Sequence, residues 1–573
     1  MAANGFGGIY IGASGLQGAQ NALNTTANNL ANVNTKGYVR QQVVFSDNAY
    51  SMLEETSLRT NAKQSGLGAT ISDVVHVRDE FVDKAYRLES GRNAFYETCY
   101  ETVGYVEDLL QELDGAEFKS SIKDLWTSFQ ELAKTPADSV TQNLVLQKSE
   151  LMLSRAQTLY NDLKEYQKNI DQQIQEDVTR VNEIGQRIYE IGLEIKKVES
   201  NGKETAMTLR DERDLLLDEL STHVKADLRE DNEGFIYITV GGVDFVSENG
   251  CNKMLIKSEG ITGLSTPYWE HLSRPDRNQY VNVFNTDQTI SSEMNTDVGS
   301  LKAKLVLRGE KFGTYSDLLT AENYQKVEDK VVIEVQAQID LLVHEIVTAV
   351  NDAMCPNIDY QVQENLYDAN GKIIYTVGQQ VQILDEANCA RGQDGSLPPQ
   401  EIYERMGMDR YTVAYDKDGK EVYVYNPEVE GENSTLYRLG NLQVNDVLKK
   451  VITKFPAYTQ NGAVDFKAAE RMLKVWEGQD MHIDPSDQYP CNFQEFYDKM
   501  VSKMGTDGNV YKSSVETLNT TTLALENSRQ QVLGVSSDEE LTKLIRYQAA
   551  YNAASRYMNV VTQMTELLIM SMA

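Results

Sequence analysis

Both ends of the chain carry residues at regular intervals of seven. Near the N-terminus one heptad position holds Ile9, Leu16, Leu23 and Leu30, and its partner position holds Gly12, Ala19, Thr26 and Val33. This spacing is typical of one face of a helix that pairs with another helix. We therefore predict an N-terminal assembly helix. Its larger apolar residues, here called the N-terminal stripe, are Ile9, Leu16, Leu23, Leu30 and Val33.

The C-terminus repeats this pattern. One heptad position holds Leu544, Tyr551, Met558 and Thr565, and the other holds Tyr547, Ala554, Val561 and Leu568. The segment opens with Ser537-Asp538-Glu539-Glu540, which predicts a capping box at the start of a helix. The residues that we expect to carry assembly here, called the C-terminal stripe, are Leu544, Tyr547, Tyr551, Met558, Val561 and Leu568.

Both terminal segments carry few charged residues. Residues 1–35 contain no Asp, Glu, Lys or Arg, although 24% of the chain is charged. After Glu540 the charged residues are Lys543, Arg546, Arg556 and Glu566. Two ordinary core-facing helices are the simpler alternative, but matched and weakly charged stripes favour pairing with each other and with other copies. Because the N-terminal segment is rich in glycine, which costs about 1 kcal/mol per residue in a helix, we expect it to be disordered in the free monomer.

The pattern between the two ends predicts an α+β multidomain chain. Residues 78–225 read as long helices, with heptad positions at Ile174, Val181, Ile188 and Ile195. Residues 226–310 change to strand spacing, and helical spacing returns over 311–355. An insert over 356–490 contains two candidate hairpins, turning at Asp368–Gly371 and Asp416–Gly419. The remaining divisions are an N-terminal segment over 1–40, an extended linker over 41–77 and C-terminal assembly helices over 491–573.

Two motifs at the chain ends resemble known sequences. The run from Asn28 to Gln41 resembles the N-terminal signature of bacterial flagellar axial proteins, and its characteristic residues are Asn28, Asn29, Asn32, Asn34, Thr35, Gly37 and Tyr38. Gly37 could serve as the C-terminal cap of the first helix. The stretch Gly534–Glu540, continuing to Tyr551, resembles the matching C-terminal signature. Each motif is weak by itself, but together at opposite ends they are specific.

The interior favours one family among the axial proteins. Hook and most rod proteins lack a long helical block after the N-terminal signature, whereas flagellin lacks the Asn-Asn…Gly-Tyr run. The combination resembles the FlgK family of hook-associated proteins. Supporting segments are Leu125–Phe129, Leu209–Asp214 and Gly299–Leu301. The resemblance covers residues 1–355 and 490–573. It implies that helices from both termini form a core, next to a helical domain and β-containing outer domains.

The resemblance also implies a role and partners. The chain would be a structural, secreted component of the flagellum, assembling into a tubular segment at the hook–filament junction without a cleaved signal peptide. Its neighbours would be the hook protein and hook-associated protein 3, and an export chaperone would hold the C-terminal helix. The alternatives are another axial protein of hook or rod type, or an enzyme or adhesin displayed through the 356–490 insert.

Composition argues against other classes of function. A net charge of −32 disfavours nucleic acids and anionic membranes, and no apolar run is long enough to span a bilayer. The five cysteines are scattered and contain no C-x-x-C pair, so neither a zinc site nor a disulfide framework is indicated. His344-Glu345 lacks the second histidine of a zinc protease motif, because position 348 is Thr. We therefore expect no enzymatic activity, no cofactor and no metal.

Overall fold

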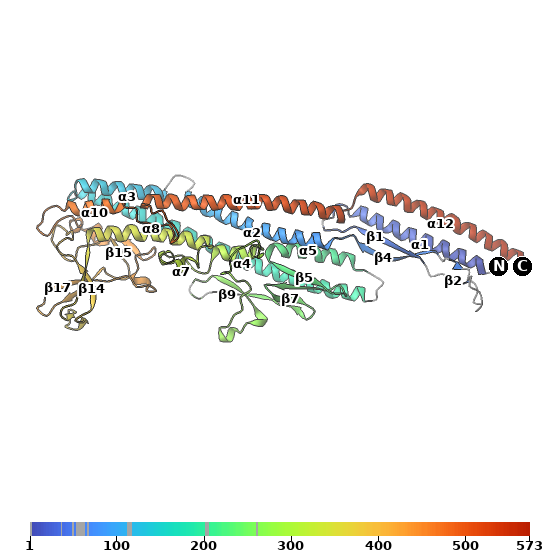
Figure 1. Cartoon of the computed structure of the whole chain (residues 1–573), viewed down its shortest axis with the longest axis horizontal. Coiled ribbons are helices and arrows are strands. Elements are labelled where there is room, and N and C mark those ends of the chain that lie inside the picture. The colour runs from blue at the N-terminus through green and yellow to red at the C-terminus, as the bar shows by residue number, and fades with distance from the viewer. Residues whose placement is uncertain are drawn as a thin grey trace.

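The computed structural model describes residues 3–35, 37–47, 51–52, 64–65, 68–111, 117–200, 205–258, 260 and 262–572. The molecule is elongated, with a pair of helices at one end and a broader body at the other (Figure 1). Both chain termini lie at the tip of the helix pair. Long helices combine with several small sheets, so the predicted α+β fold with long terminal helices is confirmed.

The helix pair consists of α1 (Ala3–Ala31) and α12 (Ser537–Met572), which lie side by side (Figure 1). The chain leaves α1 into β1 (Gln41–Asp47), which pairs antiparallel with β4 (Ala69–His76). Between them, β2 (Ser51–Met52) pairs with β3 (Gln64–Ser65). The segment predicted as an extended linker is therefore a hairpin in its described parts, and it contacts α1.

The body is built on five helices: α2 (Glu80–Gln111), α3 (Glu117–Lys134), α4 (Ser139–Glu199), α5 (Met207–His223) and α11 (Phe493–Leu533). The 61-residue α4 is capped at its N-terminus by Asp138, whose side chain accepts a hydrogen bond from the Val140 backbone N–H. At 1.5 Å per residue this helix is roughly 90 Å long. Its predicted heptad isoleucines are all buried in the body.

A small β region packs on one face of α4. It contains a sheet of order β5-β6-β7-β8, then the hairpin β9–β10 and the short helices η1, η2 and α6. Their bounds are Ala226–Glu230, Ile236–Val240, Val243–Ser247, Gly250–Cys251, Met254–Ser258, Ser265–Trp269, Glu270–Leu272, Pro275–Arg277 and Ser300–Arg308. The last of the residues expected to be β-rich thus form helix α6. Gly185 and Gly192 of α4 make room for aromatic rings, since an added Cβ would lie 2.3 Å from Phe245 Cζ and 2.7 Å from Phe235 Cε2.

The chain returns through η3 (Tyr315–Leu318), α7 (Ala321–Tyr324) and α8 (Val331–Met354) before the insert. The insert contains a sheet of order β11-β14-β17-β16-β12-β13 and the pair β15–β18. The strand bounds, β11 to β18, are Asn357–Gln361, Leu366–Tyr367, Ile373–Tyr375, Gln380–Leu384, Tyr403–Arg405, Tyr411–Tyr415, Glu421–Tyr425 and Leu442–Val444. The helices η4, α9, η5 and α10 span Asn433–Thr435, Asp446–Lys450, Ile452–Lys454 and Phe466–Glu477. Hairpins β12–β13 and β16–β17 turn where the sequence suggested.

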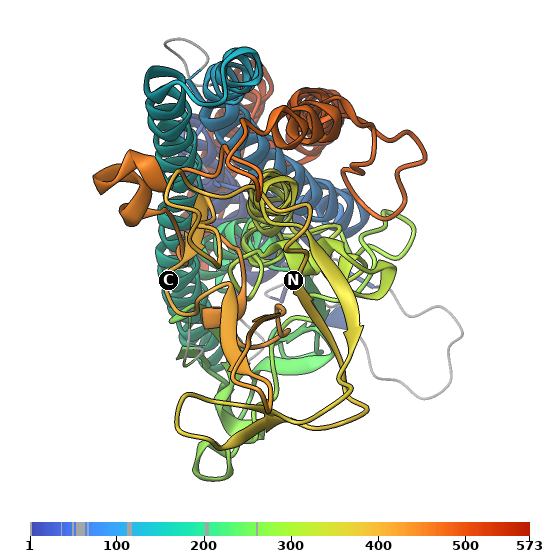
Figure 2. The ribbon, with the colours of Figure 1, turned by 90° about the vertical axis from the view of Figure 1, so that its left-hand side faces the viewer.

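The insert shares a hydrophobic core with the helices of the body. The Trp476 ring of α10 stacks on Trp126 of α3, with centroids 5.6 Å apart, and meets Phe493 of α11 edge-on at 5.1 Å. The buried Glu401 accepts a hydrogen bond of 3.0 Å from Asn351 of α8. Seen end-on, the strands of both β regions lie toward one side and most helices toward the other (Figure 2). The insert is therefore continuous with the body and is not an appended module.

We predict that Trp476→Ala destabilises the body by about 3–5 kcal/mol, the usual cost of removing a buried tryptophan side chain. Chemical denaturation of the purified chain measures this loss. Phe466→Ala on the same helix is the matched control, because Phe466 is 50% exposed while Trp476 is 5% exposed. Equal losses from both variants would show that the insert is not held through this stack.

Candidate functional site

The α1–α12 contact is made through the smallest residues of α1. Gly8 lies against Val561, Gly12 against Met558 and Gly15 against Ala554. A Cβ added at Gly12 would lie 2.6 Å from the Met558 sulfur, closer than any real Cβ contact. Glycine weakens the isolated helix but lets the two backbones approach closely. The glycines on which the expected disorder rested are thus the residues that contact α12, and in the structure of this single chain the segment is the helix α1.

The C-terminal stripe faces α1 within the same chain. Four of its six residues are half-buried: Leu544, Tyr547, Met558 and Val561. Ala554 and Thr565, at the same heptad positions, are half-buried as well, and Ala554, Met558 and Val561 lie against glycines of α1. Tyr551 is 36% exposed, and the Leu568 side chain lies outside the described residues. The Tyr547 ring also lies 6.4 Å from Phe45 of β1. Most of this stripe is used to hold the pair together.

The N-terminal stripe does not form the closest part of this contact. Gly12, Ala19 and Thr26 of the partner heptad position are buried, whereas Ile9, Leu16, Leu23 and Leu30 are half-buried, and Val33 is exposed. The physical reason is size, because a face of glycine, alanine and threonine admits the neighbouring helix more closely than a face of leucines. The leucines therefore flank the contact, and part of their surface remains accessible.

Asn29 is the centre of a buried polar joint at the base of the pair. It is 1% exposed, and both ends of its amide group are satisfied. Its Nδ2 donates to the Gln41 carbonyl at 2.9 Å and to Glu540 Oε2 at 3.0 Å. Its Oδ1 accepts from the Tyr38 hydroxyl at 2.8 Å and from the Gln41 backbone N–H at 3.1 Å. One side chain thus connects α1, β1 and α12.

The other motif residues shape the loop that leads into this joint. Asn32 Nδ2 donates to the Asn28 carbonyl at 3.0 Å, and Thr35 Oγ1 donates to Asn32 Oδ1 at 3.1 Å. Asn28 and Asn34 are both exposed. Gly37 is not a helix cap as predicted, because α1 ends at Ala31. It occupies a turn closed by the Tyr38 N–H on the Thr35 carbonyl, with φ of +81°, a value that favours glycine.

Glu540 is the C-terminal partner of the joint. It is 1% exposed and accepts from Arg40 Nε at 3.1 Å and Lys543 Nζ at 2.8 Å, while Arg40 also reaches Glu539 at 3.0 Å. Burial raises the pKa of Glu540, but the hydrogen bonds from Lys543 and Asn29 outweigh it and hold the pKa below its usual value. The capping box predicted between Ser537 and Glu540 does not form, because the Glu540 side chain is bound elsewhere. Glu540 instead reaches across to α1 and β1, and the Ser536 hydroxyl accepts from the Glu539 N–H at 3.4 Å.

The joint is tied to the body through the backbone of residues 32–40, here called the motif loop. The Arg40 N–H donates to the last carbonyl of α11, Leu533, at 3.0 Å, and the Val39 N–H donates to Asp211 of α5 at 3.3 Å. Burial raises the pKa of Asp211 to about 7. His76 lies 3.5 Å away, and burial together with nearby arginines lowers its pKa to about 4. The segment Leu209–Asp214, noted in the sequence, therefore contacts the motif loop through Asp211.

A cluster of ion pairs beneath the joint links three body helices, and the sequence analysis missed it. Arg529 of α11 contacts Asp83 of α2 at 2.6 Å and Asp218 of α5 at 2.7 Å. Arg87 contacts the same Asp218 at 2.7 Å, and Arg78 pairs with Asp83 and Asp214. These residues are scattered along a highly charged sequence, so no local pattern marks them.

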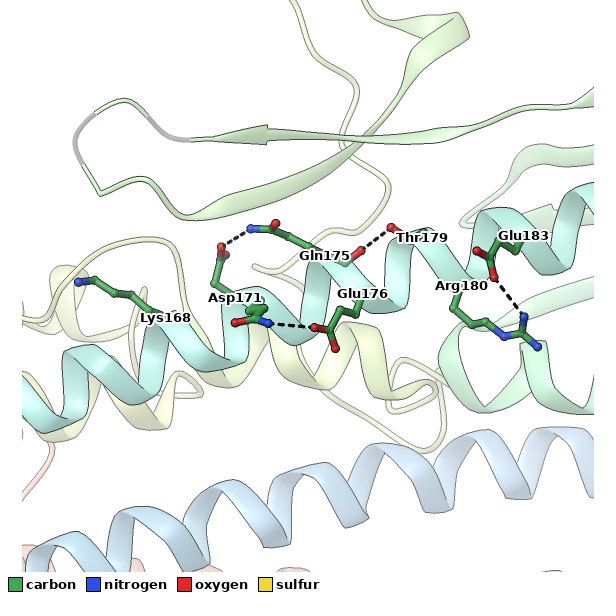
Figure 3. A pocket seen from close by; sticks show the side chains of 8 residues that line it. Lys168, Asp171, Gln175, Glu176, Thr179, Arg180 and Glu183 are labelled. Carbon is green, nitrogen blue, oxygen red and sulfur yellow. Dashed lines mark hydrogen bonds and ion pairs between the residues drawn. The ribbon is translucent and has the colours of Figure 1, made fainter.

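Two hollows of the described surface lie at the loop after α1 and along α4. A cavity of about 890 Å³ lies between the motif loop, α5 and the end of α11. A shallow groove of about 820 Å³ runs along α4, and its side chains hydrogen-bond to one another, as Gln175 does to Asp171 and Arg180 to Glu183 (Figure 3). Within the described residues, no group of three or more His, Cys, Asp or Glu side chains is placed to hold a metal ion. Over the same residues, no helix is both long and apolar enough to cross a membrane.

Two family models match the chain. Residues 103–366 match the helical domain of flagellar hook-associated protein FlgK, and residues 9–38 match the flagella basal body rod protein. The first match spans α4 and its β region, and the second spans α1 and the motif loop.

Two hook-associated proteins match almost end to end. Flagellar hook-associated protein 1 of Bacillus subtilis is 24% identical over 98% of this chain and 97% of that protein. The protein of the same name from Salmonella typhimurium is 22% identical over 97% of this chain and 98% of that protein. Flagellar hook protein FlgE of Borreliella burgdorferi is 33% identical over 15% of this chain and 24% of that protein. A solved structure, the flagellar hook junction protein FlgK from Burkholderia pseudomallei, aligns with a TM-score of 0.49 and 11% identity, covering 78% of this chain and all of that one.

We predict that Asn29→Ala loosens the helix pair by about 2 kcal/mol, because it removes the hydrogen bonds that Asn29 makes to the Gln41 backbone and to Glu540 Oε2. Amide hydrogen exchange at Gln41 measures the loss. Asn28→Ala is the matched control, since Asn28 is exposed and its substitution should cost under about 0.5 kcal/mol. Asn29→Asp should be worse than alanine at neutral pH, because it sets a second carboxylate beside Glu540. An unchanged exchange rate in Asn29→Ala would show that the joint does not depend on this side chain.

A second prediction concerns pH. The folded-state pKa of Asp211 is raised to about 7, so this carboxyl contributes stability that grows as the pH falls from about 7 toward its ordinary value near 4. The lowered pKa of His76, about 4, has the opposite effect between pH 6.5 and 4. We therefore expect the two contributions to cancel in the natural chain. Asp211→Asn should lose stability, relative to the natural chain, on acidification from pH 7 to 4, whereas His76→Gln should gain it. Parallel unfolding curves at several pH values check both, and identical pH profiles for all three chains would contradict the prediction.

Proposed function

We infer the function of this chain from its family, because it belongs to the FlgK family of flagellar hook-associated proteins. We propose that it is a structural, non-enzymatic protein of the bacterial flagellum that forms the junction between hook and filament. Relatives named flagellar hook-associated protein 1 match this chain over nearly their whole length, including both ends. The alternatives, a hook or rod protein, or an enzyme or adhesin displayed through the 356–490 insert, are not favoured by these matches.

The observation that carries the assembly mechanism is the surface of α12 turned away from α1. Large apolar side chains are exposed there, with Ile545 66%, Val560 53%, Met564 65% and Leu567 67% accessible. Apolar residues on every side of a helix indicate burial in a larger structure. Copies that pack against these residues would shield them in a tube. The C-terminal stripe holds the pair together, and this outward surface makes contact between copies.

The same surface supports the proposed partners. It needs cover before export, and an export chaperone on α12 would supply it. In the flagellum the hook protein would lie below the tube and hook-associated protein 3 above it. We also propose that the chain is exported with its N-terminus retained. A repeated head-to-tail contact between identical copies generates a helical tube, which suits a junction between two tubular structures.

We predict that Val560→Asp combined with Met564→Asp abolishes filament attachment but leaves the monomer intact, because a buried unpaired charge costs several kcal/mol. In the bacterium that produces this chain, a strain lacking the gene should have hooks without filaments, and the double variant should fail to restore them. Filaments are counted by negative-stain microscopy, with Val560→Leu and Met564→Leu as the conservative control.

The inward-facing pair Met558→Asp and Val561→Asp gives the contrasting result. It should also abolish filaments, but by separating α1 from α12, so limited proteolysis of the purified monomer should remove both chain ends faster than in the natural chain. The outward variant should leave the rate of proteolysis unchanged. Normal filaments on hooks that carry the outward variant would overturn the assembly mechanism.

A further inference from the structure

The outer half of the helix pair contains two isolated charges. Beyond Arg546, α12 carries Arg556 and Glu566, and α1 carries no charged side chain. Both residues are exposed. Among the described residues, neither has a hydrogen bond or ion pair, whereas Arg546 lies over the Tyr547 ring at 5.3 Å and Lys543 is bound to Glu540. One cation and one anion therefore stand alone on a surface that otherwise carries no charge and that exposes several large apolar side chains.

Arg556 and Glu566 cannot satisfy each other within one copy. They are ten residues apart on a continuous helix, which corresponds to about 15 Å along the axis at 1.5 Å per residue. Ten residues also rotate the direction of the side chain by about 80° at 3.6 residues per turn. The two side chains thus point in different directions at different heights along the helix.

Assembly changes the energetics of these charges. Val560, Met564 and Leu567 are exposed in the same turns of the helix as Arg556 and Glu566. When copies cover those apolar residues, they also withdraw the neighbouring charges from water. An unpaired buried charge costs several kcal/mol, but a charge that meets its opposite loses much less. Each copy supplies one charge of each sign, so a second copy is the complementary partner.

We propose that Arg556 of one copy pairs with Glu566 of the next, and that this ion pair fixes the axial stagger between neighbouring helix pairs at about 15 Å. The inference rests on the proposed assembly function and adds the register of its contact. Apolar contact alone specifies the register between two helices weakly, because an apolar surface can shift along another at little cost in free energy. An ion pair forms at one axial position only and therefore selects the register. Because the contact joins different positions on the two copies, it is head-to-tail and repeats along the assembly.

Charge reversal tests the pairing. Arg556→Glu and Glu566→Arg should each reduce the number of filament-bearing hooks by about tenfold, because like charges then meet at the contact. The chain carrying both reversals restores opposite charges and should return to within about twofold of the natural count. Both positions are exposed in the monomer, so circular dichroism of each purified variant should match that of the natural chain.

Cross-linking tests the geometry without relying on function. A chain with Arg556→Cys and Glu566→Cys should form covalent multimers with a short bismaleimide in isolated hook–filament junctions, whereas either single variant should not. The natural cysteines provide a low background, because four are buried and Cys251 is half-buried.

Three outcomes would overturn the register proposal. One is a normal filament count from both single reversals. Another is rescue of Arg556→Glu by Asp538→Arg instead of Glu566→Arg, since Asp538 is the other exposed acid of α12 outside the joint for which the structure gives no ion pair. The last is an absence of multimers from the double-cysteine chain. In each case the variant Val560→Asp with Met564→Asp still tests the assembly function separately. The proposed register and the proposed function can therefore fail independently.

Discussion

The hydrogen bond between Asn29 and Glu540 joins residues that lie 511 positions apart, and the arrangement of the chain ends depends on it. Asn29 is bound on all sides by α1, β1 and α12, so the helix pair cannot rotate without breaking buried polar contacts. Such contacts contribute little net stability when formed but are expensive to lose. The joint therefore acts as a geometric constraint on how a thin pair of helices leaves a much larger body.

The body to which the helix pair is joined is held together by one large hydrophobic core. The helix α4 runs through it, and aromatic rings from the β region fit against its glycines at 185 and 192. The insert is part of the same core, because its Trp476 stacks on Trp126 of α3. Beneath the joint, Arg529 connects α2, α5 and α11. A shared core and shared ion pairs therefore join the elements of the body beneath the joint.

The helix pair follows a different physical rule. Its internal contact is made of glycines against Met558, Val561 and Ala554, which gives close approach but little buried apolar area. Much of its larger apolar surface points outward instead. A pair built in this way is only partly buried within one copy, and under the proposed assembly neighbouring copies would cover the rest. This division between a self-sufficient body and unsatisfied ends is what an assembling axial protein requires.

The sequence by itself determined the helical ends, the long helix α4, the turns of both hairpins and the family. These features depend on local periodicity, turn chemistry and short motifs, which are visible along one chain. Only the tertiary structure decided that glycines form the closest face of α1, that Gly37 shapes a turn, and that Asn29 reaches Glu540. It also decided that the insert is part of the core. These outcomes depend on which distant residues meet and how closely, and heptad spacing gives the same pattern for a face that packs within the chain as for one that packs against a neighbour.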